Sequence, residues 1–472
     1  MGNDCEIFRI NKQLCDFSKD GRFFALAHHD KLIIKNATTL DICLTFDFKY
    51  TIEGFEWSPR SDYVLCYNIK DCYVQIFSIY YPDWEFKLTE GSSGLENVIW
   101  APDNKHIITV SNFKIQISIW CLESHSVTYI QNLKSSVSNG IQFSPNGKYL
   151  ALIVNGQGHD DVDVYRTKDW LLSRKLICKG LSSVDGFAWS PSSELVSIWC
   201  KISGLAKLII YSIANENYEG IFQPLDNVYN STLDELSKKK FNEELRGLET
   251  VNWMPNGQFL AVSGHNETVI LLSYITWKPL LNIRLKPVIK ESDYLIRVFK
   301  EIIKVDLKTT SNKMLKGNNT IFIDSGSRYI EEVSNRPVNI PIDENENSLG
   351  VSAYSSPIKI MDILEFSFCA RYLAIRNRNY LRTLWIWDIR TNAVDVLILK
   401  NIISSVKWNP VDPKLIIFTD SACMFEWNSD NTNCLNTPKG MTMVDARFHP
   451  SGNSAILCGY NRAVIYKFDQ ET

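Results

Sequence analysis

The sequence has no apolar run of 18 residues, the length that a helix needs to cross a membrane. Residues 1–5 lack the basic and apolar regions of a secretory signal. The formal net charge is −3, so the chain also lacks the basic excess that draws proteins to nucleic acid. We therefore expect a cytoplasmic protein that neither inserts into membranes nor binds nucleic acid.

Several kinds of chemistry are also missing from the sequence. The phosphate-binding patterns G-x-x-x-x-G-K-[ST] and G-x-G-x-x-G and the hydrolase pattern G-x-S-x-G do not occur. None of the 12 cysteines forms C-x-x-C, and the seven histidines show no ligand spacing. We expect reduced cysteines in the core, no catalytic residue, no metal site and no cofactor, and hence a protein that is not an enzyme.

Aromatic residues, by contrast, are abundant at 12% of the chain, and nine of them recur in one setting. Each stands in an apolar segment, precedes a polar turn and is followed by a second apolar run, as in FSPNGKYLA from Phe143. These anchors are Phe17, Trp57, Trp100, Phe143, Trp189, Trp253, Phe366, Trp408 and Phe448. Their successive spacings are 40, 43, 43, 46, 64, 113, 42 and 40 residues.

A period near 40 to 45 residues is that of one four-stranded propeller blade. The turn after each anchor separates two strands, because proline fixes φ and glycine tolerates positive φ. A third apolar strand and a more polar fourth strand precede the next anchor. The sequence therefore predicts an all-β, WD-repeat-like β-propeller over residues 1–472, a single closed ring of about nine blades. Seven or eight blades, or two unequal rings, are the alternatives.

The last repeat is one strand short. After Phe448 the chain has room for strands at 454–458 and 463–468 and then ends. The strand-like segment at residues 6–10 precedes the first anchor and belongs to no repeat. We expect it to pair with the last blade, because closure removes an exposed sheet edge.

Two spacings exceed the period and indicate insertions at 225–248, between the fifth and sixth blades, and at 287–357, between the sixth and seventh. Residues 284–316 hold nine Lys and Arg against four Asp and Glu, whereas 324–346 hold six acidic residues against two basic. Both insertions, like the segment 90–95, join the last strand of one blade to the first of the next. We expect them on one face, where loops on a rigid scaffold bind partners. The candidate partner-binding residues are Glu90, Ser92, Gly94, Leu95, Lys238, Lys239, Lys240, Lys290, Arg297, Lys300 and Lys304.

Some segments resemble one family beyond what the repeat requires. They include LCDFSKDG from Leu14, PDW from Pro82, EGSSGL from Glu90, IWCL from Ile119, KDW from Lys168, ITWK from Ile275, YLAIRN from Tyr372 and WIWDI from Trp385. With them the chain resembles, over nearly its whole length, the WD repeat protein 8 family of centrosomal, centriolar-satellite and spindle-pole proteins. Only Trp387-Asp388 is a literal Trp-Asp pair.

The resemblance implies a protein of the cytoskeleton at the microtubule-organising centre, the centrosome or spindle pole. It implies microtubule minus-end anchoring, spindle-pole organisation and basal-body or cilium assembly. The implied partners are a coiled-coil microtubule-anchoring protein and a minus-end-directed kinesin, and no catalytic residue is implied.

The residues themselves leave two other functions open. A ribosome-associated translation-initiation propeller also uses degenerate repeats, but it should carry a basic, RNA-facing surface, which a net charge of −3 does not favour. A generic WD-repeat adaptor is the other alternative. We expect a non-catalytic scaffold for protein interactions.

Overall fold

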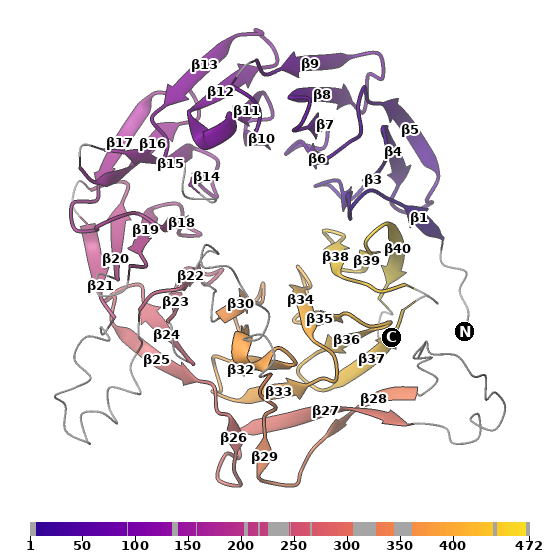
Figure 1. Cartoon of the computed structure of the whole chain (residues 1–472), viewed down its shortest axis with the longest axis vertical. Helices are drawn as coiled ribbons and strands as arrows, with labels where there is room; N and C mark the ends of the chain where they lie inside the picture. Colours follow the sequence, from indigo (N-terminus) through magenta and orange to yellow (C-terminus); the bar gives the residue numbers. More distant parts are fainter. Residues whose placement is uncertain are drawn as a thin grey trace, which may run out of the picture. The chain divides into compact units, whose positions relative to one another are not determined.

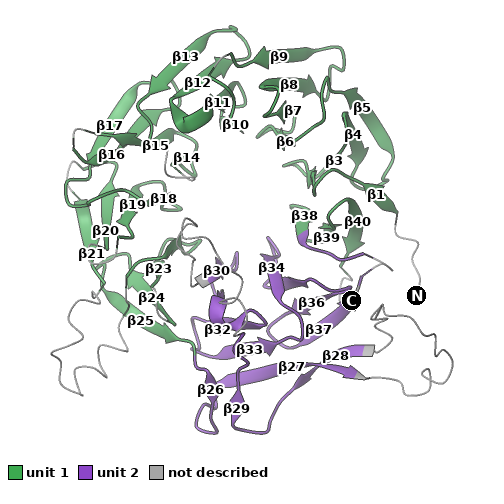
Figure 2. Ribbon diagram, in the orientation of Figure 1, with its two compact units in different colours: residues 1–285, 357–361, 446–472 green, residues 286–356, 362–445 purple. Residues whose placement is uncertain are grey.

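The computed structural model describes residues 6–91, 93–134, 140–156, 158–202, 206–215, 218–224, 245, 247–264, 267–304, 327–343, 361–437 and 441–468. The strands are labelled in chain order in Figure 1. The chain divides into two compact units (Figure 2). Unit 1 holds residues 1–285, 357–361 and 446–472, and unit 2 holds residues 286–356 and 362–445. No helix in the described ranges is long and apolar enough to cross a membrane.

Unit 1 carries seven antiparallel four-stranded sheets, each of which is one blade. The first three consist of β2 (Cys15–Phe17), β3 (Phe23–His28), β4 (Lys31–Asn36) and β5 (Ile42–Asp47); β6 (Gly54–Trp57), β7 (Tyr63–Asn68), β8 (Tyr73–Ser78) and β9 (Glu85–Thr89); and β10 (Asn97–Trp100), β11 (His106–Val110), β12 (Gln116–Cys121) and β13 (Val127–Gln131). The next three consist of β14 (Ile141–Phe143), β15 (Tyr149–Asn155), β16 (Asp160–Arg166) and β17 (Leu172–Ile177); β18 (Gly186–Trp189), β19 (Leu195–Cys200), β20 (Lys207–Ser212) and β21 (Tyr218–Phe222); and β22 (Thr250–Trp253), β23 (Phe259–Ser263), β24 (Thr268–Ser273) and β25 (Pro279–Arg284). The seventh sheet of unit 1 is the ninth blade of the chain. It consists of β1 (Ile7–Arg9), β38 (Asp445–Phe448), β39 (Ser454–Cys458) and β40 (Arg462–Lys467).

Unit 2 carries the seventh and eighth blades and four further strands. The seventh blade consists of β30 (Met361–Phe366), β31 (Tyr372–Asn377), β32 (Thr383–Asp388) and β33 (Val394–Ile398), and the eighth of β34 (Ile403–Trp408), β35 (Leu415–Thr419), β36 (Cys423–Trp427) and β37 (Thr432–Asn436). The further strands are β26 (Val288–Ile289), β27 (Ile296–Lys304), β28 (Ser327–Glu332) and β29 (Val338–Asn339). The predicted all-β propeller of nine four-stranded blades is confirmed.

The turn after each anchor explains the polar composition of the repeat. The residue four places after the anchor has a positive φ at Gly21, Ser61, Asn104, Gly147, Ser193, Gly257, Ala370 and Gly452. Glycine and asparagine adopt this conformation at the lowest cost. The serine after the anchor closes the turn with its hydroxyl, which accepts from the N–H of Tyr63 in the case of Ser58, at 3.1 Å.

The tryptophan anchors join each blade to the one before it. The indole Nε1–H donates to the backbone oxygen of the residue just before the preceding anchor, from Trp57 to Asp16 (3.2 Å), Trp100 to Glu56 (3.2 Å), Trp189 to Gln142 (3.3 Å) and Trp408 to Glu365 (3.1 Å). Trp253 makes the same connection through a hydroxyl. It donates to Ser197 at 3.1 Å, and Ser197 donates to the backbone oxygen of Ala188 at 3.0 Å.

The N-terminal strand β1 lies in the same sheet as the last strands of the chain. It pairs antiparallel with β40, with Ile7 opposite Val464 and Arg9 opposite Arg462. Phe8 and Ile10 are buried in a cluster that includes residues of β2, β3, β39 and β40. The N-terminal segment therefore supplies the fourth strand of the last blade.

Part of the expected insertion at 287–357 is regular sheet. β27 runs parallel to β33 and extends the seventh blade, and β28 pairs antiparallel with β27, so that one sheet has six strands. In that second pairing Lys300, from the basic segment, stands opposite Glu331, from the acidic one. Of the other expected insertion, 225–248, only residues 245, 247 and 248 are described, and Leu245 and Leu248 are buried in the core beside the sixth blade.

Candidate functional site

Three residues expected on a partner-binding face, Glu90, Gly94 and Leu95, pack against the third blade. The Glu90 carboxylate accepts a short hydrogen bond from the Thr109 hydroxyl and another from Trp120 Nε1 at 3.3 Å. Leu95 is fully buried in the core. Gly94 has a φ of +68°, and a Cβ there would lie 2.1 Å from the Asn112 side chain. The structure therefore gives these three residues a packing role.

The other predicted contact residues divide by position. Ser92, Lys238, Lys239 and Lys240 lie outside the described residues. Lys290 and Lys300 are exposed in unit 2, and Lys304 is the last residue of β27. Glu90 belongs to unit 1, whereas the three lysines belong to unit 2. That all these residues share one face therefore stays a prediction. Arg297, at the start of β27, lines a pocket.

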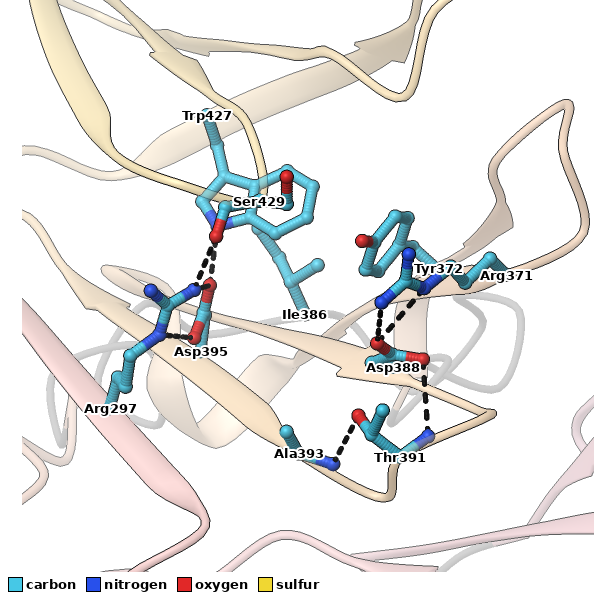
Figure 3. A pocket seen from close by; sticks show the side chains of 10 residues that line it. All are labelled: Arg297, Arg371, Tyr372, Ile386, Asp388, Thr391, Ala393, Asp395, Trp427 and Ser429. Carbon is cyan, nitrogen blue, oxygen red and sulfur yellow. Dashed lines mark hydrogen bonds and ion pairs between the residues drawn. The ribbon is translucent and has the colours of Figure 1, made fainter.

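That pocket lies within unit 2 and has a volume of about 220 Å³. It is lined by Arg297 of β27, by Arg371, Tyr372, Ile386, Asp388, Thr391, Ala393 and Asp395 of the seventh blade, and by Trp427 and Ser429 of the eighth. Figure 3 shows two arginines on opposite sides, each bonded to its own aspartate, with Ile386, Tyr372 and Trp427 between them. We call it the Arg297–Arg371 pocket.

The parallel register of β27 and β33 creates the first ion pair, because it places Arg297 opposite Asp395. Arg297 donates from Nε to Oδ1 at 2.8 Å and from Nη2 to Oδ2 at 2.7 Å. Trp427 Nε1 donates to the same Oδ2 at 2.8 Å, and Arg297 Nη2 also reaches the backbone oxygen of Ser429 at 2.8 Å. Hydrogen bonding to Asp395 raises the pKa of Arg297. A nearly buried carboxylate thus has every oxygen paired.

The second pair joins Arg371 to the aspartate of the Trp-Asp sequence. Arg371 donates from Nε at 3.0 Å and from Nη2 at 2.7 Å to Oδ2 of Asp388. The other oxygen, Oδ1, accepts from the backbone N–H groups of Arg390 and Thr391. Burial alone would raise the pKa of Asp388, but the bonds from Arg371 and from the turn lower it. Asp388 therefore stays ionised and holds both Arg371 and the turn.

Aromatic rings form the rest of the wall. The Tyr372 and Trp427 rings meet edge to face with centroids 5.1 Å apart, and Trp427 meets Trp408 in the same way at 5.9 Å. The Arg371 guanidinium lies over the Tyr372 ring, 4.9 Å from its centroid. Burial raises the pKa of Tyr372, so its hydroxyl stays protonated at neutral pH.

The arrangement is suited to binding. Both aspartates are held in ion pairs, so neither is placed to act as a general base. Among the described residues, no group of three His, Cys, Asp or Glu side chains is placed to hold a metal ion.

The sequence pointed to Arg297 by charge alone and missed Arg371, Asp388 and Asp395. One signal was available for Asp395, which is a single charge in the apolar run VDVLI of β33. A charge in such a strand requires a partner. Arg297 is this partner because β27 pairs with β33. No local sequence pattern predicts that pairing.

A larger groove of about 1250 Å³ lies in unit 1 along the turns of the fourth, fifth and sixth blades. Tyr149, Trp253 and the exposed Ile275 contribute rings and apolar surface, and Arg174 and Glu194 contribute opposite charges.

Comparison with known proteins gives both close and distant similarities. The family model of the eukaryotic translation initiation factor eIF2A matches residues 31–157. The WD repeat-containing protein WRAP73 of Mus musculus is 28% identical over 462 residues, which cover 96% of this chain and 93% of that protein. An uncharacterised WD repeat-containing protein of Schizosaccharomyces pombe is 20% identical over 423 residues, covering 86% of this chain and 76% of that protein.

Among solved structures, a eukaryotic initiation factor matches with a TM-score of 0.54 and 9% identity, covering 93% of this chain and 90% of that one. At this identity the likeness concerns the fold alone. The similarities and the repeated blades together support a WD-repeat protein, alike to its mouse relative over nearly its entire length.

Proposed function

We propose that this protein is a non-catalytic scaffold for protein interactions at microtubule-organising centres. There it supports microtubule minus-end anchoring, spindle-pole organisation and basal-body or cilium assembly. Its partners in this proposal are a coiled-coil microtubule-anchoring protein and a minus-end-directed kinesin.

The observation that carries the scaffold role is the Arg297–Arg371 pocket, in which two arginines form ion pairs with two buried aspartates. Such a site is preformed for recognition and holds no free base. The location at microtubule-organising centres is supported by the segments of the sequence that resemble the centrosomal and spindle-pole family.

A tagged protein tests the location. The chain is expressed from its own promoter with a fluorescent protein after residue 472, and the fluorescent protein alone serves as the control. We expect foci that coincide with a marker of spindle poles, and recovery of the two partner classes with the tagged chain. A uniform distribution through mitosis would overturn the location.

A second function is favoured by a specific observation, the match of residues 31–157 to the translation initiation factor model. Under this alternative the protein associates with ribosomes. Sucrose-gradient sedimentation of the same tagged cells separates the two proposals. Scaffold function at spindle poles predicts tagged protein at the top of the gradient, whereas translation initiation predicts co-sedimentation with the small ribosomal subunit.

A further inference from the structure

We propose that the Arg297–Arg371 pocket binds an acidic side chain, together with an adjacent apolar residue, from a peptide segment of a protein partner. This inference rests on the proposed scaffold function and specifies the chemistry of one partner.

The hydrogen-bond inventory of the pocket indicates the charge of the ligand. The oxygens of Asp388 and Asp395 all accept hydrogen bonds from arginines, from Trp427 or from turn amides. Each arginine uses Nε and Nη2 for its aspartate, and in the described structure neither Nη1 group has a protein partner. The acceptors are thus occupied while donors remain. A ligand must therefore bring acceptors, and a carboxylate is the acceptor that an arginine binds most strongly.

The size of the pocket indicates how much of a partner enters. At about 220 Å³ it is smaller than the roughly 300–1,000 Å³ typical of small-molecule sites. It has room for one or two side chains. Because Ile386, Tyr372 and Trp427 lie between the arginines, the space beside the charged group is apolar. A glutamate or aspartate next to an apolar residue matches both parts.

The arginines are held in place but remain accessible. Their side chains are 40% and 39% exposed for Arg297 and Arg371, so ligands reach them from solvent. Each guanidinium is fixed by a carboxylate and lies over a ring, of Phe299 and of Tyr372 respectively. Little rotamer freedom is left to lose on binding, and this preorganisation favours affinity.

Arg371 is the principal contact. Arg297 Nη2 already donates to two acceptors, Asp395 Oδ2 and the backbone oxygen of Ser429. Arg371 Nη2 donates to Asp388 alone, so Arg371 has more donor capacity left for a ligand. We therefore assign the carboxylate of the ligand to Arg371 Nη1 and treat Arg297 as a secondary contact.

The repeat provides a matched control. Arg22 stands five residues after its anchor, as Arg371 does, and it too pairs with an aspartate, Asp20. It lies in the first blade, in unit 1, and outside the pocket.

Fluorescence polarisation tests the proposal with three labelled peptides, GGFEFGG, GGFQFGG and GGFKFGG. We expect GGFEFGG to bind the full chain about tenfold or more tightly than GGFQFGG, with no binding of GGFKFGG. Arg371→Gln should reduce binding of GGFEFGG to the level of GGFQFGG, and Arg22→Gln should leave it unchanged. Circular dichroism confirms that both variants are folded.

Equal affinity for GGFEFGG and GGFQFGG, absence of binding, or an equal effect of the two substitutions would overturn the proposal. Imaging separates this failure from failure of the proposed function. If the peptides do not bind but the tagged protein still gathers at spindle poles, the scaffold function stands without this site. If GGFEFGG binds as expected but the protein is absent from spindle poles, the peptide-binding proposal is supported and the proposed location is wrong.

Discussion

The tryptophan anchors contribute a ring, which is buried at Trp57, Trp100, Trp189 and Trp253 and partly buried at Trp408, and an indole hydrogen bond. Two substitutions at Trp189 separate these contributions. Trp189→Phe keeps most of the ring but loses the 3.3 Å bond to Gln142, which should cost about 1 kcal/mol of unfolding free energy. Trp189→Ala also empties a site stacked on Tyr149 and should cost about 3–5 kcal/mol. Urea unfolding followed by circular dichroism measures both, with the exposed Tyr81→Phe as control. An equal cost for Phe and Ala would show that the ring contributes nothing.

His106 makes the third blade sensitive to pH. Its Nδ1 lies 2.5 Å from Oδ2 of Asp103, and this hydrogen bond raises the pKa of His106 above 6.5. A raised histidine pKa stabilises the fold fully below pH 6.5, and this contribution is lost as the pH rises through the pKa of the folded state. Burial alone would raise the pKa of Asp103, but the hydrogen bonds from the His106 side chain and from two backbone N–H groups lower it.

We therefore expect His106→Gln to destabilise the protein by roughly 0.5–1 kcal/mol at pH 5.5, and by less at pH 9. The measurement is urea unfolding of both proteins at the two pH values. A difference that grows toward pH 9 would contradict this assignment, because the ion pair requires the protonated ring.

At the scale of the strand, β1 is the first element to test. Phe8 and Ile10 are buried, and Phe8 packs edge to face on Phe24 at 5.7 Å. Deleting residues 1–10 removes this core contact and leaves β40 as an exposed edge, which promotes association. We expect lower solubility and a lower melting temperature than in a control deletion of residues 1–5. Identical melting and sedimentation of the two deletions would refute a structural role for β1.

The insertion strands allow a second comparison. Val298 and Phe299 of β27 are buried, and Glu301 pairs with Arg328 in the interior. Replacing 287–357 by a Gly/Ser bridge removes these strands and leaves Asp395 without Arg297, which should cost several kcal/mol because a nearly buried charge loses its partner. Replacing only 305–326 keeps both strands and should leave the melting temperature unchanged. Calorimetry decides, and equal melting of both variants would contradict the pairing of β27 with β33.

The sequence predicts a strand well when the strand that pairs with it is close along the chain. The anchors and turns repeat every 40 to 46 residues where no insertion intervenes, and hairpin neighbours pair in chain order, so the blades followed from periodicity. β1 followed from the missing strand after Phe448. β27 did not, because its parallel partner β33 lies about a hundred residues away and is already a complete blade edge. The same long-range pairing places Arg297 opposite Asp395, so local sequence patterns could not predict this side of the pocket.

At the scale of the whole molecule, nine degenerate repeats form the fold with a single literal Trp-Asp pair. The tryptophan-to-carbonyl bonds need only a backbone acceptor, so the residues beside the anchors are free to vary. This tolerance is consistent with 28% identity to the mouse relative across 96% of the chain.

The pairing of β1 with β40 has a consequence for synthesis of the protein. β1 leaves the ribosome long before β40, the strand with which it pairs, and at 5–20 residues per second roughly 25–90 s separate the two. During that interval the apolar side chains of Phe8 and Ile10 lack the partners that bury them, which is the situation in which chaperones bind nascent chains. Stalled nascent chains test this. Those that end at residue 440 should retain chaperones and be cut by protease within residues 1–14, whereas chains extended until residue 472 is outside the ribosome should resist cleavage there.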